Sequence, residues 1–83
     1  MTDGSPVTPL DLKGLKCPLP ALHTRKMLRR MPPGALLIVE CTDPLSAIDI
    51  PHLVNETGDE LERSLRSDDI YVFHIRRAAR DGS

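Results

Sequence analysis

The chain has 83 residues, of which 40% are hydrophobic and 28% are charged, and its formal net charge is −1. This length predicts one domain with a small core, and two cysteines are too few for a disulfide framework. One tyrosine and one phenylalanine predict an aliphatic core and argue against a surface that stacks single-stranded nucleic acid. The sequence has no charged-then-apolar leader and no apolar run of about 18 residues, so we expect no membrane association and a cytoplasmic location.

The charges are unevenly distributed along the chain. Residues 1–34 contain six lysines and arginines and two aspartates, whereas residues 35–83 contain five arginines and ten acidic residues. One explanation of the basic half is a helix face that is simply solvated. The other is a surface that attracts an acidic partner protein by its charge. Both interpretations remain open at this point.

The two ends of the chain are predicted to flank one folded unit. Residues 1–8 contain glycine, serine and proline and predict a flexible N-terminal tail, and residues 79–83 predict a C-terminal tail. Residues 9–78 are then the single domain. Its first element is a short strand at Leu10-Asp11-Leu12, followed by a turn at Gly14.

Cys17 is the most informative residue of the chain, because it lies in Gly14-Leu15-Lys16-Cys17-Pro18-Leu19-Pro20 between this strand and a predicted helix over residues 18–31. Proline suits the first helical turn, where its missing N–H has no partner, so Cys17 is expected at the helix cap. The positive end of the helix dipole would lower the pKa of the thiol and favour the nucleophilic thiolate. The alternative is a small buried residue at a tight turn. Lys16 is a candidate for electrostatic support or a solvated lysine, and Pro18 and Pro20 are interpreted as stiffening the turn.

The predicted helix over residues 18–31 has two distinct faces. A stripe that faces the core is made of Ala21, Thr24, Leu28 and Met31, with Met27 at its edge. Two leucines lie outside this stripe, beside cations and within a turn or so of Cys17. They are interpreted either as part of a docking surface for a partner or as isolated exposed leucines. The candidate docking residues are Leu19, Leu22, Arg25, Lys26 and Arg29.

The second half of the chain predicts a further helix and three strands. The apolar run 35–41 is a central strand, with Leu37, Val39 and Cys41 on one face. Because Pro51 would interrupt a longer helix, a loose turn from Pro44 is expected before a helix over residues 50–57 that Gly58 caps. Residues around Leu61 and Leu65 and around 71–75 predict two strands joined by a hairpin turn at residues 67–69.

The order βαβαββ predicts an α/β (α+β) two-layer sandwich. A strand–helix–strand unit places its two strands parallel through a right-handed crossover, and the last two strands pair antiparallel. Both helices then cover one face of a four-stranded mixed sheet. The uncovered face is expected to carry Leu36, Ile38, Ile70 and Val72.

The chain resembles the TusA/SirA-like family of small sulfur-carrier proteins over nearly all of residues 10–77. The matching pieces are the segment Leu10 to Pro20 with its Cys-Pro-x-Pro motif, the turn Pro33-Gly34, and Asp43-Pro44 followed by Asp49-Ile50-Pro51. The resemblance implies a sulfurtransferase-type carrier in which Cys17 accepts sulfane sulfur as a persulfide from a cysteine desulfurase or another persulfide donor. It also implies transfer to an acceptor protein in tRNA thiolation, cofactor assembly or sulfur oxidation.

Two other functions compete with a sulfur carrier. Cys41 is favoured as a buried structural thiol, but it could instead resolve an oxidised Cys17 in a redox or regulatory module if the two Cα atoms lie within about 7 Å. The basic helix could bind nucleic acid, although the net charge and the lack of stacking aromatics argue against it. The three histidines lack ligand spacing, so no metal site is expected, and thiol chemistry requires no organic cofactor.

Overall fold

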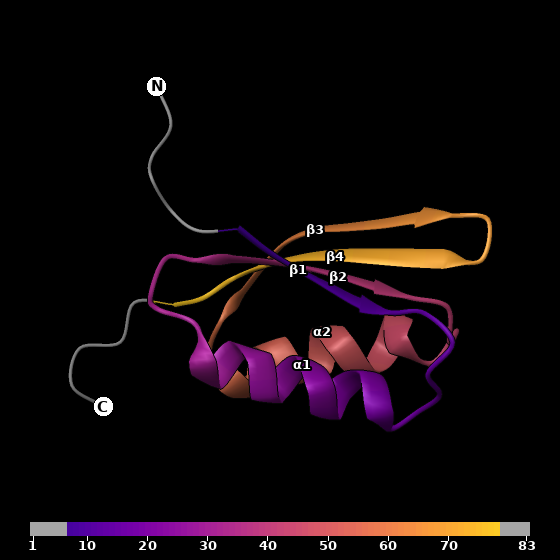
Figure 1. Cartoon of the computed structure of the whole chain (residues 1–83), viewed down its shortest axis with the longest axis horizontal. Coiled ribbons are helices and arrows are strands. Elements are labelled where there is room, and N and C mark those ends of the chain that lie inside the picture. Colours follow the sequence, from indigo (N-terminus) through magenta and orange to yellow (C-terminus); the bar gives the residue numbers. More distant parts are fainter. Residues whose placement is uncertain (1–6, 79–83) are drawn as a thin grey trace.

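The computed structural model describes residues 7–78. Its elements are β1 (Val7–Leu12), α1 (Leu19–Arg30), β2 (Leu36–Cys41), α2 (Ser46–Thr57), β3 (Glu60–Ser67) and β4 (Ile70–Arg76). The predicted order βαβαββ is therefore confirmed (Figure 1). Neither helix within the described residues has the length and apolar character that a membrane span requires.

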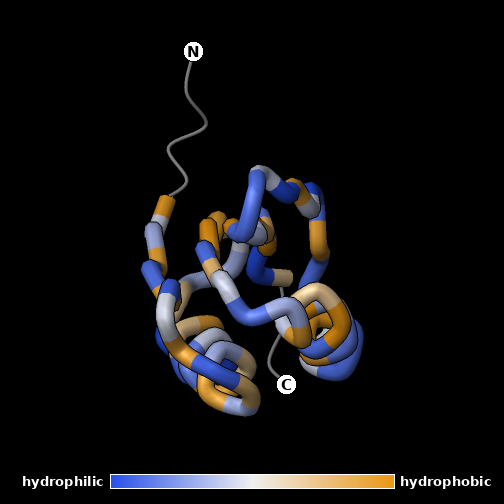
Figure 2. Tube along the Cα trace, turned by 90° about the vertical axis from the view of Figure 1, so that its right-hand side faces the viewer, coloured by the Kyte–Doolittle hydropathy of each residue, from blue (hydrophilic) through white to orange (hydrophobic). Residues whose placement is uncertain are grey.

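The sheet has the strand order β1-β2-β4-β3. Strands β1 and β2 are parallel, with Val7 opposite Leu36 and Leu12 opposite Cys41. Strand β4 is antiparallel to both β2 and β3, so the sheet is mixed as predicted. Figure 1 shows both helices on the same side of the sheet, and they lie side by side in Figure 2. The two-layer architecture is confirmed.

The core lies between the sheet and the two helices. On the helix side of the central strands, Leu37, Val39 and Phe73 have no exposed surface. The helices contribute Leu28 and Ile50 to the same cluster. The opposite face of the sheet carries the residues predicted for it, none of which is fully buried: Leu36, Ile38, Ile70 and Val72.

Strand β1 begins earlier than the sequence pattern indicates. The expected tail 1–8 overlaps the strand at Val7 and Thr8, so its boundary is wrong by two residues, and residues 1–6 and 79–83 lie outside the described part of the chain. The sequence pattern does not predict a strand across Pro9, because proline has no N–H to donate to a neighbouring strand. It is accommodated here because β1 is an edge strand that pairs only with β2 among the described strands.

The second helix also begins earlier, at Ser46, so the predicted loose turn before a helix over residues 50–57 is wrong. The Asp43 carboxylate accepts the Leu45 N–H, and the Ser46 hydroxyl donates to the Asp43 carbonyl at 2.7 Å, which together start the helix. Pro51 lies inside α2 and removes one hydrogen bond, to the carbonyl four residues earlier. The end of the helix is as predicted, because Gly58 adopts a left-handed conformation (φ 81°) and donates to the Val54 carbonyl.

Candidate functional site: an exposed cysteine between two carboxylates

Cys17 lies in the loop between β1 and α1, on the end of the molecule where α1 begins, and its side chain is exposed. The predicted helix starts one residue later than expected, at Leu19, and Pro18 is its cap residue. Cys17 therefore precedes the cap. The Cys17–Pro18 peptide bond is cis. The exposure of the thiol contradicts the alternative of a small buried residue at a turn.

Two aspartates from the next loop and helix bind the main chain and the side chain of Cys17. The Cys17 N–H donates to Oδ2 of Asp43 at 2.5 Å, and Asp43 lies in the loop between β2 and α2. The Cys17 Sγ donates to Oδ2 of Asp49 at 2.9 Å, and Asp49 lies in the first turn of α2. The site therefore joins three segments that are separated in the sequence.

The expected lowering of the Cys17 pKa is wrong. The hydrogen bond to Asp49 raises the pKa of the thiol, and desolvation and the negative charges of Asp49 and Asp43 act in the same direction. The helix end opposes them weakly, because Pro18 and Pro20 have no N–H and the Leu19 N–H is used by the Lys16 carbonyl at 2.8 Å. Cys17 is thus an accessible thiol whose pKa is raised by its acidic neighbours.

The residues predicted to support the motif have separate structural tasks. Gly14 has a φ of 88°, which favours glycine, and its N–H donates to the Thr42 hydroxyl at 2.9 Å. Pro20 is buried at the start of α1, and Pro18 is exposed beside the thiol. Lys16 is exposed in the loop. Gly14 and Asp43 therefore both fasten the β1–α1 loop to the loop that follows β2.

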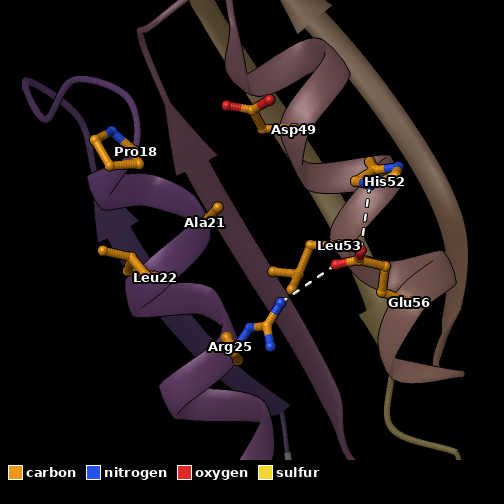
Figure 3. A pocket seen from close by; sticks show the side chains of 8 residues that line it. All are labelled: Pro18, Ala21, Leu22, Arg25, Asp49, His52, Leu53 and Glu56. Atoms are coloured by element: carbon orange, nitrogen blue, oxygen red, sulfur yellow. Dashed lines mark hydrogen bonds and ion pairs between the residues drawn. The ribbon is translucent and has the colours of Figure 1, made fainter.

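The five predicted docking residues line one hollow on the outer surface of α1, together with His23: Leu19, Leu22, Arg25, Lys26 and Arg29. A second hollow, of about 370 Å³, lies between α1 and α2 (Figure 3). Asp49 lines it near one end, and Arg25 and Glu56 form an ion pair across it at 3.3 Å. Leu22 and Arg25 belong to both hollows, so the two form one continuous surface that reaches Asp49, the hydrogen-bond partner of the thiol.

Cys41 is a buried residue of the core, as the favoured interpretation predicts. It has no exposed surface, and burial raises the pKa of its thiol. Cys17 and Cys41 are both free thiols. Burial of Cys41 leaves no accessible partner for an oxidised Cys17, which argues against the redox module. Within residues 7–78, no three histidine, cysteine, aspartate or glutamate side chains are grouped so as to hold a metal ion.

The aromatic side chains offer no platform for nucleic-acid bases. Phe73 is fully buried, and Tyr71 packs against the core with the Arg66 guanidinium 5.2 Å from its ring centroid. Stacking on exposed rings is the usual means of binding single strands. This arrangement therefore gives no support to a nucleic-acid binder.

Comparison with known proteins places the chain in a family. Residues 8–77 match the profile of a family described as Sulfurtransferase TusA. The chain belongs to the TusA family. The match spans the whole described fold except for its terminal residues, and it includes Cys17, Asp43 and Asp49.

Two relatives named as sulfur carriers match most of this chain along most of their own length. A sulfur carrier protein TusA of Pseudomonas putida (strain W619) is 38% identical over 79 residues, which cover 95% of this chain and 99% of the relative. A sulfur carrier protein TusA of Allochromatium vinosum is 39% identical over 69 residues, covering 83% of this chain and 91% of the relative. A crystal structure of a SirA-like protein from Desulfitobacterium hafniense has a TM-score of 0.75 at 17% identity, covering 88% of this chain and 99% of that one. This last similarity supports the fold.

The contacts of Asp43 and Asp49 with Cys17 are the part of the site that sequence reasoning missed. Asp49 lies within α2, and its carboxylate accepts a hydrogen bond from the Cys17 thiol. A signal was present, because both aspartates are among the residues that carry the family resemblance. The partners could not be assigned from spacing, since Asp43 and Asp49 are 26 and 32 residues from Cys17.

Proposed function

We propose that this TusA-family protein is a sulfur carrier that receives sulfane sulfur on Cys17 and passes it to a second protein. The observation that carries the proposal is the exposed Cys17 thiol, held by two loops at one end of the molecule within the Cys-Pro-x-Pro segment. The full-length relatives named as sulfur carriers support it. A cysteine desulfurase or another persulfide donor would supply the sulfur, in the cytoplasm.

The transfer consists of two thiol exchange steps. In the first, the Cys17 thiol loses its proton to solvent, and the thiolate attacks the outer sulfur of the donor persulfide, whose own thiolate leaves. In the second, an acceptor thiolate attacks the outer sulfur on Cys17, and the Cys17 thiolate leaves and is protonated. Sulfur moves without net oxidation, so these steps need neither a metal nor an organic cofactor.

The proposal is tested by loading the purified protein. Incubation with a cysteine desulfurase, pyridoxal phosphate and cysteine is expected to add one sulfur atom, measured as a mass gain of the intact protein. Cyanide should then remove this sulfur as thiocyanate and restore the starting mass. A protein that gains no sulfur, or that gains sulfur which cyanide cannot release, contradicts the carrier function.

The hollow on α1 is proposed as the docking surface for an acidic partner. The double substitution Lys26→Glu with Arg29→Glu is expected to slow loading by up to about tenfold at low ionic strength, because exposed charges steer encounter more than they stabilise the fold. The initial loading rate measured at several salt concentrations is the readout. Arg63→Glu with Arg66→Glu on β3 makes the same change in net charge away from α1. An equal loss in this control would assign the effect to net charge and contradict the docking surface.

A further inference from the structure

The charge around Cys17 is unusual for a cysteine that must react with other thiols. Its Sγ is 2.9 Å from an Asp49 oxygen, and the Asp43 carboxylate binds the N–H of the same residue. Among residues 7–78, no lysine, arginine or histidine forms an ion pair with Asp49. Within residues 7–78, the Asp49 carboxylate is therefore held in no ion pair, although Arg25 and His52 line the same hollow.

We propose that Asp49 is a specificity-determining residue of the sulfur carrier, and that its carboxylate disfavours transfer of the Cys17 sulfur to small anionic thiols. This inference rests on the proposed function. The reactive form of a free thiol is its thiolate, and the most abundant small thiols of cells carry carboxylates in addition. Such a nucleophile meets the Asp49 charge as it approaches the sulfur bound to Cys17, and a protein partner can offset this repulsion with its own docking contacts.

The chemistry of the disfavoured reaction is a simple exchange. The free thiolate attacks the outer sulfur of the Cys17 persulfide, a new S–S bond forms, and the bond to the Cys17 Sγ breaks. The Cys17 Sγ leaves as a thiolate beside Asp49 and takes a proton from water. The repulsion between Asp49 and the nucleophile depends on the charge of the nucleophile. The free energy needed to form the Cys17 thiolate beside Asp49 is the same for every nucleophile. A ratio of rates for two nucleophiles isolates the first effect.

The test compares cysteamine, whose ammonium group offsets its thiolate, with glutathione, whose thiolate form has a net charge of −2. Rates of sulfur release from the loaded protein are measured at equal thiolate concentrations. In the wild type, release to cysteamine should be faster, and Asp49→Asn should lower the cysteamine-to-glutathione ratio by about fivefold, the effect of one charge about 4 Å away in a water-like medium. Asp69→Asn in the β3–β4 hairpin removes an equal charge elsewhere and should leave the ratio unchanged. An unchanged ratio in Asp49→Asn overturns the proposal.

Two further measurements keep the proposal separate from the carrier function and from folding. In the unloaded protein, the ratio of alkylation rates by anionic iodoacetate and neutral iodoacetamide should rise in Asp49→Asn. This holds whether or not the protein accepts sulfur, so a failure to load contradicts the carrier function alone. In the wild type, added salt should raise the rate of alkylation by iodoacetate relative to iodoacetamide, because salt screens the Asp49 charge. This measurement tests the repulsion without any substitution. A wild-type ratio that is independent of salt overturns the proposal.

Discussion

A protein with Cys17→Ser is expected to gain no sulfur from a persulfide donor, whereas a protein with Cys41→Ser is expected to load at close to the wild-type rate. The reason is access. Cys17 is exposed at the end of the molecule, and Cys41 has no exposed surface on the helix side of β2. A hydroxyl is too weak a nucleophile to replace a thiolate in attack on sulfur, so the loss in Cys17→Ser should be complete within detection. Intact-protein mass spectrometry after incubation with the donor measures it.

The Cys41→Ser protein is the matched control, because it also loses one thiol. Its core gains a buried hydroxyl, so thermal unfolding should be recorded with the loading assay and the comparison made well below its midpoint. Sulfur found on the Cys17→Ser protein, or a loss of loading in folded Cys41→Ser, would contradict the assignment of the carrier cysteine. An intramolecular disulfide in the oxidised wild type would instead support the redox module.

The second large effect is expected in the core, where Phe73→Ala should destabilise the protein by about 3 to 5 kcal/mol. Phe73 is fully buried in β4 opposite Val39, and it packs toward the helices. Its removal leaves a cavity that the surrounding aliphatic side chains fill only partly. Because small domains are stable by roughly 5 to 15 kcal/mol, this loss is a large part of the total. Urea denaturation followed by circular dichroism gives the free energy of unfolding.

Val72→Ala is the control on the same strand. Val72 is the neighbour of Phe73 on the uncovered face of the sheet and is only partly buried, so its truncation should cost about 1 kcal/mol. Equal losses for the two substitutions would contradict a sheet that helices cover on one side only.

Strand parity and helix stripes predicted most of the fold. Strand parity in the apolar run 35–41 placed Leu37 and Val39 on one face, which is the buried one, and the apolar stripe on the first helix identified Leu28 as a core residue. The errors occurred at prolines. Pro9 concealed the start of β1 and Pro51 the first turn of α2, since an edge strand and a packed helix both tolerate a missing N–H and sequence patterns do not reveal this.

Only the part of the candidate site that is contiguous in sequence with Cys17 was predicted. The segment around Cys17 located the thiol, but the sign of its pKa shift depends on Asp49, which is 32 residues away and approaches through the packing of α2 beside α1. A rule based on the helix dipole therefore pointed in the wrong direction. Charges from distant segments can outweigh a partial charge at a helix end, particularly where two prolines have removed its donors.

The hydrogen bonds from Gly14 to Thr42 and from Cys17 to Asp43 tie the cysteine loop to the segment that follows the central strand. Cys17 is consequently fastened to the scaffold through main-chain hydrogen bonds on its loop. The two sulfur atoms must come within bonding distance for an exchange, so the sulfur of the other protein has to move to Cys17. For the proposed transfer, the partner protein would therefore have to bring its own thiol to Cys17.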